Sequence, residues 1–158
     1  MEAPDNRLDR LPRSLTELKA MFGSLPAGDE PVGDHRAEFI GPRPLRGAAP
    51  RAIALGGMPR WYGKRFAGDG TAVNLLRASA AADAPLLERL PMTVGIEPSW
   101  WDGQPAIVVS YGSAGPIPWR WVRDEFRALE AGILLGLTFA GGRWSRHAAA
   151  PFLLIRES

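Results

Sequence analysis

A succession of short strand-like segments in the second half of the chain limits the possible folds more than any other feature. Runs of β-branched and aromatic residues alternate there with glycine-containing turns, and Asp102-Gly103 is typical of a hairpin turn of two residues. The expected strands are 92–97, 106–111, 119–129, 133–139 and 152–156. Consecutive strands joined by tight turns form an antiparallel meander, and such a meander removes its exposed edges best by closing into a barrel.

The first half of the chain predicts a helix and a second group of elements. Ser14 and Glu17 form a capping box at the start of an amphipathic helix that ends near Gly23. The further elements expected are strands at 35–40 and 61–66, a short helix at 50–55, a helical turn at 73–76 and a loop at 78–84.

The length of 158 residues suits one domain. Residues 1–13 are polar and charged and are expected to form a flexible arm, whereas 14–158 form a single domain. The predicted fold class is therefore mainly β: an antiparallel up-and-down barrel with a short N-terminal helix and one or two short helical insertions.

Composition excludes several classes of function. The chain has no cysteine, which removes disulfides, thiolate zinc sites and cysteine nucleophiles. Its net charge is only +2, and acidic residues lie among the basic ones throughout, so no nucleic-acid partner is expected. The first residues do not form a secretory signal, and the longest apolar run is too short for a membrane helix, which predicts a cytoplasmic protein.

Motifs in both halves of the chain resemble those of a bacterial protein family. Residues 61–66 read Trp-Tyr-Gly-Lys-Arg-Phe, and residues 124–129 read Asp-Glu-Phe-Arg-Ala-Leu, followed by leucine-rich segments at 134–137 and 151–156. Together they resemble proteins that pair a Gly-x-Trp-x-Gly domain with a C-terminal domain of unknown function. The signature is degraded here, because residues 33–37 read Gly-Asp-His-Arg-Ala. The resemblance implies a lipocalin-like barrel that binds an apolar or amphipathic ligand such as a lipid.

The expected strand 119–129 has mixed character on both of its faces. Side chains alternate between the faces of a strand, so one face carries aromatic residues and arginines and the other carries Asp124 and Phe126. A strand that lines a cavity with a polar end would show this mixture. A twisted strand with a bulge, whose arginines extend into water, would show it as well.

The expected strand 61–66 also mixes charged and aromatic residues. Gly63 is suited to a close approach of a ligand or of another backbone. Lys64 or Arg65 is suited to holding a carboxylate or phosphate, and the alternative is a structural ion pair with Asp124 or Glu125.

His35 lies at the degraded signature, and it is suited to act as a general base, as a haem ligand or in a purely structural role. The chain has two histidines, far apart in sequence, so neither a metal nor a cofactor is expected. Trp100 and Trp101 precede the hairpin turn, where they would serve core packing, a ligand portal or peripheral membrane contact.

These observations lead to one hypothesis and two alternatives. The first is a binding protein, not an enzyme, that holds a small amphipathic or lipid-like molecule with an acidic end in a barrel pocket. The alternatives are a small-molecule isomerase, cyclase or hydrolase that uses Asp124 or Glu125 beside an arginine, and an interaction module with a filled barrel. The candidate ligand-binding residues are His35, Trp61, Tyr62, Lys64, Arg65, Trp119, Trp121, Asp124, Phe126 and Arg127. The oligomeric state is not predicted.

Overall fold

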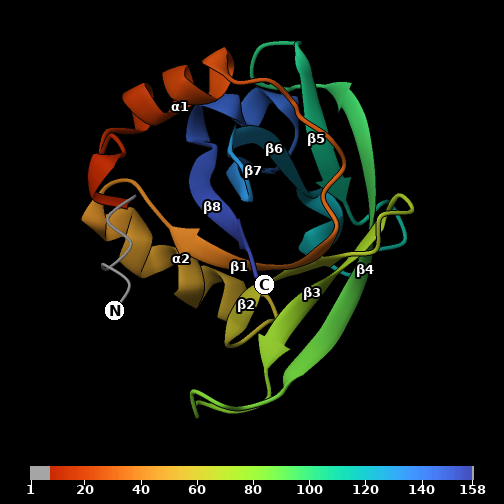
Figure 1. Ribbon diagram of the computed structural model, residues 1–158. Helices are drawn as coiled ribbons and strands as arrows, with labels where there is room; N and C mark the ends of the chain where they lie inside the picture. The colour runs from red at the N-terminus through yellow and green to blue at the C-terminus, as the bar shows by residue number, and fades with distance from the viewer. Residues whose placement is uncertain (1–7, 158) are drawn as a thin grey trace.

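The strands of the protein follow one another around a closed antiparallel barrel (Figure 1). The structure, a computed structural model, describes residues 8–157. The strands are β1 (Gly33–Phe39), β2 (Trp61–Phe66), β3 (Thr71–Arg77), β4 (Leu86–Pro98), β5 (Pro105–Ser110), β6 (Val122–Glu130), β7 (Ile133–Ala140) and β8 (Ala150–Arg156). The helices are α1 (Leu15–Ser24) and α2 (Arg43–Leu55), with 3₁₀ turns η1 (Leu8–Arg10), η2 (Trp119–Trp121) and η3 (Arg143–Ala148).

The barrel closes because the first strand pairs with the last. β1 and β8 are antiparallel, with Phe39 opposite Phe152, and every other strand pairs with its neighbours in the sequence. The predicted mainly β, up-and-down barrel is thus confirmed, with the strand number that lipocalins also have. Of the predicted flexible arm, residues 1–7 lie outside the described part, and Leu8–Arg10 forms η1.

Ser14 caps the start of α1 as predicted. The Ser14 hydroxyl accepts a hydrogen bond from the backbone N–H of Glu17 at 3.1 Å. Leu18 and Phe22 of α1 are fully buried against side chains of the outer face of β7 and β8. The part of the barrel wall formed by β7 and β8 is therefore covered by α1 on its outer face.

One predicted element was wrong in type, and one predicted strand began too early. Residues 73–76 belong to strand β3, not to a helical turn, because both neighbouring strands pair with them and Asn74 is fully buried there. Residues 119–121 form η2, so the predicted strand 119–129 begins only at Val122. Local propensity was outweighed in the first case by pairing on both sides of the strand.

Two further predictions had the wrong extent. The helix expected at 50–55 is α2, which begins at Arg43 and contains Pro50; the proline lies on the exposed part of the helix, where water can satisfy the backbone carbonyl that loses its partner. The hairpin turn at Asp102-Gly103 is longer than two residues. It spans Ser99–Gln104, and the backbone N–H of Ser99 donates to the carbonyl of Gln104.

Gly63 is required by a close approach between β1 and β2. A Cβ atom at this position would lie only 1.9 Å from the backbone oxygen of His35. The register of β2 against β3 also shifts between Trp61 and Gly63. The group that approaches Gly63 closely, as predicted, is therefore the backbone of the neighbouring strand β1.

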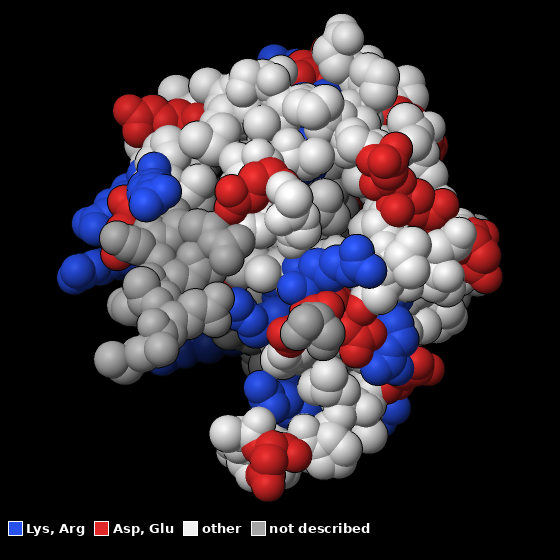
Figure 2. All heavy atoms as spheres, viewed as in Figure 1, with Lys and Arg blue, Asp and Glu red and all other residues white. Residues whose placement is uncertain are grey.

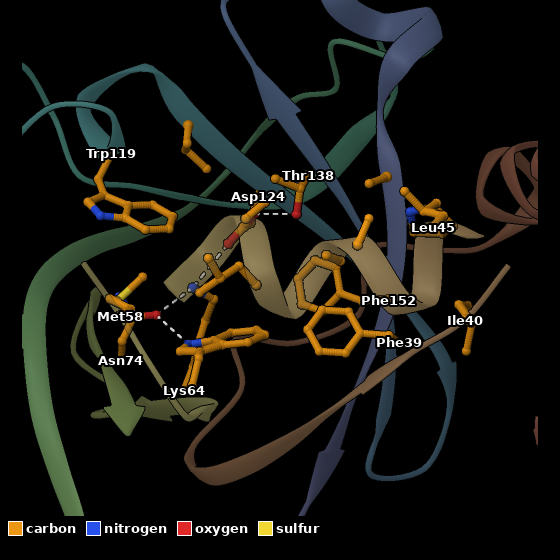
Figure 3. A pocket seen from close by; sticks show the side chains of 18 of the residues that line it. Phe39, Ile40, Leu45, Met58, Lys64, Asn74, Trp119, Asp124, Thr138 and Phe152 are labelled. Carbon is orange, nitrogen blue, oxygen red and sulfur yellow. Dashed lines mark hydrogen bonds and ion pairs between the residues drawn. The ribbon is translucent and has the colours of Figure 1, made fainter. Parts of the chain in front are cut away.

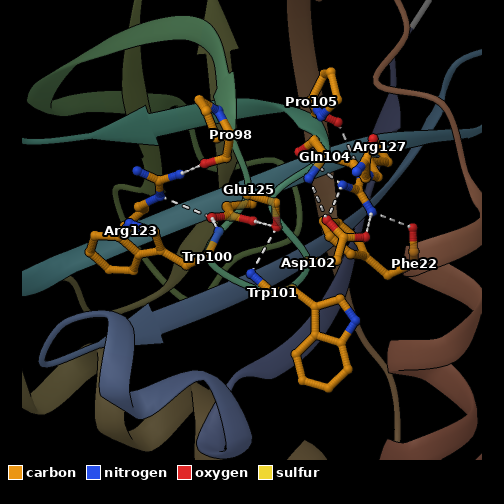
Figure 4. Close-up of polar contacts among 11 residues, drawn as sticks. Phe22, Pro98, Trp100, Trp101, Asp102, Gln104, Pro105, Arg123, Glu125 and Arg127 are labelled. Carbon is orange, nitrogen blue, oxygen red and sulfur yellow. Dashed lines mark hydrogen bonds and ion pairs between the residues drawn. The ribbon is translucent and has the colours of Figure 1, made fainter.

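Both faces of β6 are buried, which explains their mixed character. Asp124 points into the barrel, whereas Glu125 and Arg127 point out of it and are covered by α1 and by the Ser99–Gln104 loop (Figure 4). Arg127, 0% exposed, donates two hydrogen bonds to the Asp102 carboxylate, at 2.7 Å each, and further ones to the carbonyls of Phe22, Gln104 and Pro105. This arginine joins α1, β6 and the loop.

The exposed charges are mixed in sign. On the face shown in Figure 2, lysines and arginines lie among aspartates and glutamates, without a large area of one sign. Arg65 illustrates this arrangement, since it pairs with both Asp34 and Glu88 at the surface. In the described part of the chain, neither helix has the length and apolar character needed to cross a bilayer.

Candidate functional site

A cavity of about 270 Å³ lies between α2 and one end of the barrel. The apolar residues that line it from the barrel and its connecting segments are Phe39, Ile40, Met58, Trp61, Trp119, Val122, Ala150, Pro151 and Phe152. Those that line it from α2 are Leu45, Ala48, Ala49, Ala52 and Ile53. Ligand pockets commonly measure roughly 300–1,000 Å³, so this cavity suits a small ring system better than a long acyl chain.

Helix α2 forms the cover of the cavity (Figure 3). Its cavity-lining residues recur at helical spacing, which gives α2 one apolar face. None of its residues is buried, in contrast to those of α1. Its C-terminal end is held by Trp119, whose indole Nε1 donates to the carbonyl of Gly56 at 2.7 Å.

Five polar residues on one side of the cavity form what we call the polar cluster: Lys64, Asn74, Tyr111, Asp124 and Thr138. The Lys64 ammonium lies 3.0 Å from Asp124 Oδ2, and Thr138 donates to Asp124 Oδ1 at 2.8 Å. Lys64 also donates to Asn74 Oδ1 at 3.1 Å, and Asn74 Nδ2 donates to the Tyr111 hydroxyl at 2.8 Å. These contacts form a continuous hydrogen-bonded chain from β7 through β6 and β2 to β3 and the end of β5. Figure 3 shows the part from Thr138 through Asp124 and Lys64 to Asn74.

The apolar wall is connected to the polar cluster through Trp61. Its indole Nε1 donates to the same Asn74 oxygen at 3.1 Å, and the Lys64 ammonium lies 5.6 Å from the Trp61 ring centroid. Asn74 thereby fixes the positions of both neighbours. The cavity combines an aromatic wall with an ordered polar side, as small-molecule sites commonly do.

Burial and charge pairing act in opposite directions on Lys64, which is only 1% exposed. Burial alone would lower the pKa of its ammonium, but the attraction of the facing Asp124 and Tyr111 oxygens and the hydrogen bonds to them together outweigh burial, and the pKa lies above its ordinary value. Lys64 is therefore a cation at neutral pH. Its charge is balanced by Asp124, so the pair adds no net charge to the cavity.

Four of the ten predicted site residues line this cavity: Trp61, Lys64, Trp119 and Asp124. Phe126 lies deeper in the barrel, where its ring meets those of Phe66 and Phe152. Tyr62, Arg65, Trp121 and Arg127 do not line the cavity. Arg65 and Arg127 have acidic partners outside the barrel, and Tyr62 stacks on Arg77.

Sequence reasoning missed three members of the polar cluster and all of the cover. Asn74 is a polar residue within the otherwise apolar run 72–76, a signal that the helical interpretation of 73–76 concealed. The helical spacing of Leu45, Ala49 and Ile53 was also present in the sequence. Tyr111 and Thr138 gave no comparable signal, because their roles depend on which strands close the barrel.

His35 is buried inside the barrel but does not line the cavity. Its ring packs edge-on against Phe66 at 5.1 Å between centroids, and its Nδ1 lies 3.1 Å from the carbonyl oxygen of Gly33. Burial lowers the pKa of His35, so its ring is neutral at pH 7. Among the described residues, no group of three or more His, Cys, Asp or Glu side chains is placed to hold a metal ion.

We expect His35 to make the protein less stable as the pH falls from 7 to 5. Because its pKa is lower in the folded state, the unfolded state takes up the proton first, below its ordinary pKa of about 6.5, and stability is lost from there down to the folded pKa. Urea denaturation at both pH values should show a smaller loss for His35→Gln than for the wild type. His147→Gln, at an exposed histidine, should behave as the wild type does; an equal loss in all three proteins would contradict this assignment.

A second, wider hollow of about 710 Å³ lies on the outer face of β5 and β6. It is lined by Trp121, which is 54% exposed, and by polar residues including Arg120 and Arg123. A molecule bound there would remain largely in contact with water. The covered cavity is therefore the better candidate for a ligand site.

Of the two carboxylates considered for catalysis, only Asp124 lines the cavity. Both of its oxygens are engaged, by Lys64 and by Thr138. Glu125 lies outside the barrel, where it accepts hydrogen bonds from Ser99, from the backbone N–H of Trp100 and from Arg123. The position of Glu125 makes it part of the outer packing.

Comparison with known proteins bears on the fold. No family model matches the chain, and no curated protein matches it in sequence. A crystal structure of a protein from Thermomonospora curvata is similar to it with a TM-score of 0.66 and 20% sequence identity, over 92% of this chain and 88% of that chain. At this level of identity, the likeness shows that the two chains share the barrel fold.

Proposed function

We propose that this protein binds a small amphipathic or lipid-like molecule in the cavity beneath α2. The apolar body of the ligand would contact the aromatic wall and the apolar face of α2, and its polar end would meet the polar cluster. The resemblance to the Gly-x-Trp-x-Gly barrel proteins, which stays a prediction, points to the same class of function.

The observation that carries this proposal is the cover itself. An amphipathic helix stabilises a fold by burying its apolar face, yet no residue of α2 is buried and its apolar side chains line the cavity instead. A filled barrel, as an interaction module would have, would bring that face into contact with the protein's own core. A bound apolar molecule would provide the missing contacts.

Filling the cavity is expected to abolish this binding. Ala49 lines the cavity from α2, so Ala49→Trp should place an indole there and weaken binding of the fluorescent dye N-phenyl-1-naphthylamine at least about tenfold, as expected when a pocket loses the space for a ring. Fluorescence titration measures the effect. Ala54→Trp is the matched control, because Ala54 is exposed on the same helix and does not line the cavity. No saturable dye binding by the wild type, or equal binding by both variants, would contradict the proposal.

A further inference from the structure

The Tyr111 hydroxyl differs from the other polar groups of the cavity in its hydrogen bonding. Its oxygen accepts hydrogen bonds from Asn74 Nδ2, at 2.8 Å, and from the Lys64 ammonium, but among residues 8–157 we find no hydrogen bond that this hydroxyl donates. Burial raises the pKa of Tyr111, so the hydroxyl keeps its hydrogen at neutral pH. The tyrosine side chain lines the cavity.

Each of the other side-chain donor groups around the cavity makes at least one hydrogen bond, and Asn74 donates one of its two amide hydrogens to Tyr111. The Lys64 ammonium, which has three hydrogens, contacts Asp124 Oδ2, Asn74 Oδ1, the Tyr111 hydroxyl oxygen and, at 3.4 Å, Met92 Sδ. The hydroxyl of Thr138 donates to Asp124, and the indole N–H groups of Trp61 and Trp119 donate to Asn74 and to the Gly56 carbonyl. Tyr111 therefore provides a hydroxyl donor that a ligand can use without breaking a contact of the protein.

The charges of the polar cluster select against an ionic ligand. Lys64 and Asp124 cancel one another, and both are almost fully buried. A ligand carboxylate would add a second negative charge beside Asp124, and a ligand ammonium would add a second positive charge beside Lys64. Neither added charge would have a partner, and an unpaired charge in a mostly apolar site is costly.

We propose that the cavity selects a neutral, mostly apolar molecule that carries a carbonyl oxygen, which accepts a hydrogen bond from the Tyr111 hydroxyl. This inference rests on the proposed function and narrows its ligand class. It differs from the acidic ligand that the sequence suggested. That expectation relied on Lys64, whose charge Asp124 balances, and on Arg65 and Arg127, which have partners outside the barrel.

The test compares two molecules of nearly equal shape, 2-acetylnaphthalene and 2-isopropenylnaphthalene, in which a methylene group replaces the carbonyl oxygen. Their dissociation constants are measured by NMR titration of the wild type, Tyr111→Phe and Tyr62→Phe. We expect the preference for the ketone over the hydrocarbon to fall about five- to tenfold in Tyr111→Phe, the effect of one buried hydrogen bond. Tyr62 does not line the cavity, so Tyr62→Phe should keep the wild-type preference.

Infrared spectroscopy of bound 2-acetylnaphthalene tests the hydrogen bond to the ketone independently of affinity. Its carbonyl stretch should lie at lower frequency in the wild type than in Tyr111→Phe, because a donated hydrogen bond weakens the C=O bond. The anion 2-naphthoate should bind more weakly than the ketone. Tighter binding of 2-naphthoate, or an unchanged ketone preference in Tyr111→Phe, would overturn the carbonyl assignment.

The same titrations separate this assignment from the proposed function. If the hydrocarbon and the ketone both bind, and Ala49→Trp blocks both, but the preference is insensitive to Tyr111, only the carbonyl assignment fails. If neither compound binds the wild type saturably, the proposed function fails and the carbonyl assignment fails with it.

Discussion

Replacing Lys64 with methionine is expected to lower the free energy of unfolding by about 3–5 kcal/mol, the usual effect of removing one partner of a buried ion pair. Methionine fills nearly the same space but leaves Asp124 as a buried carboxylate without its cation. Chemical denaturation at neutral pH measures the loss. We therefore expect the fold around the cavity to depend on the pairing of the two charges more than on the presence of either.

The double variant Lys64→Met with Asp124→Leu provides the decisive comparison. Removing both charges eliminates the unpaired carboxylate, so this protein should regain at least half of the lost stability. Arg65→Met is the matched control at an exposed pair, since Arg65 and its partners Asp34 and Glu88 are all partly in water, and it should cost no more than about 1 kcal/mol. If the double variant is no more stable than Lys64→Met, the unpaired charge of Asp124 is not the cause of the lost stability.

Replacing Arg127 with leucine is expected to cost about 3 kcal/mol of stability while leaving dye binding unchanged. The substitution leaves the carbonyls of Phe22, Gln104 and Pro105 without their donor and separates α1 from the Ser99–Gln104 loop. Arg127 points away from the cavity, so the dissociation constant of N-phenyl-1-naphthylamine should stay at the wild-type value. Weaker dye binding in a folded Arg127→Leu protein would instead support the direct ligand contact expected from the sequence.

The pH dependence of Arg127→Leu should differ from that of the wild type in acid. The hydrogen bonds from Arg127 are the main cause that holds the pKa of Asp102 below its ordinary value. This contribution to stability is complete above about pH 4 and is lost as the pH falls through the folded pKa. The wild type should therefore lose stability below pH 4 more steeply than the variant. Arg89→Leu, at an exposed arginine, should match the wild type within about 0.5 kcal/mol at neutral pH.

The sequence was sufficient to predict the order and class of most elements. The capping box at Ser14 and the strand at 61–66 occur where they were expected, and the meander closes as the need to remove sheet edges suggested. These features depend on local signals, such as caps, turn residues and the spacing of apolar side chains. Local signals are present in the chain whether or not it is folded.

The inner and outer faces of the strands could not be assigned in this way. Alternation identifies the inner face only where the outer face meets water, but α1 and the Ser99–Gln104 loop cover the outside of β6. Arg127 is consequently as buried as Lys64, although one faces α1 and the other the cavity. The polar cluster also depends on contacts between strands distant in sequence, as between Asn74 and Tyr111, which no short segment encodes.

The closed hydrogen-bond ladder has a consequence for how such a protein can diversify. Because β1 pairs with β8, the barrel closes without α2, and α2 takes no part in the strand pairing of the sheet. Substitutions at Leu45 or Ala49 are therefore expected to reshape the site at little cost to folding. Selection could act on ligand preference through this one helix, while the barrel preserves the ability to fold.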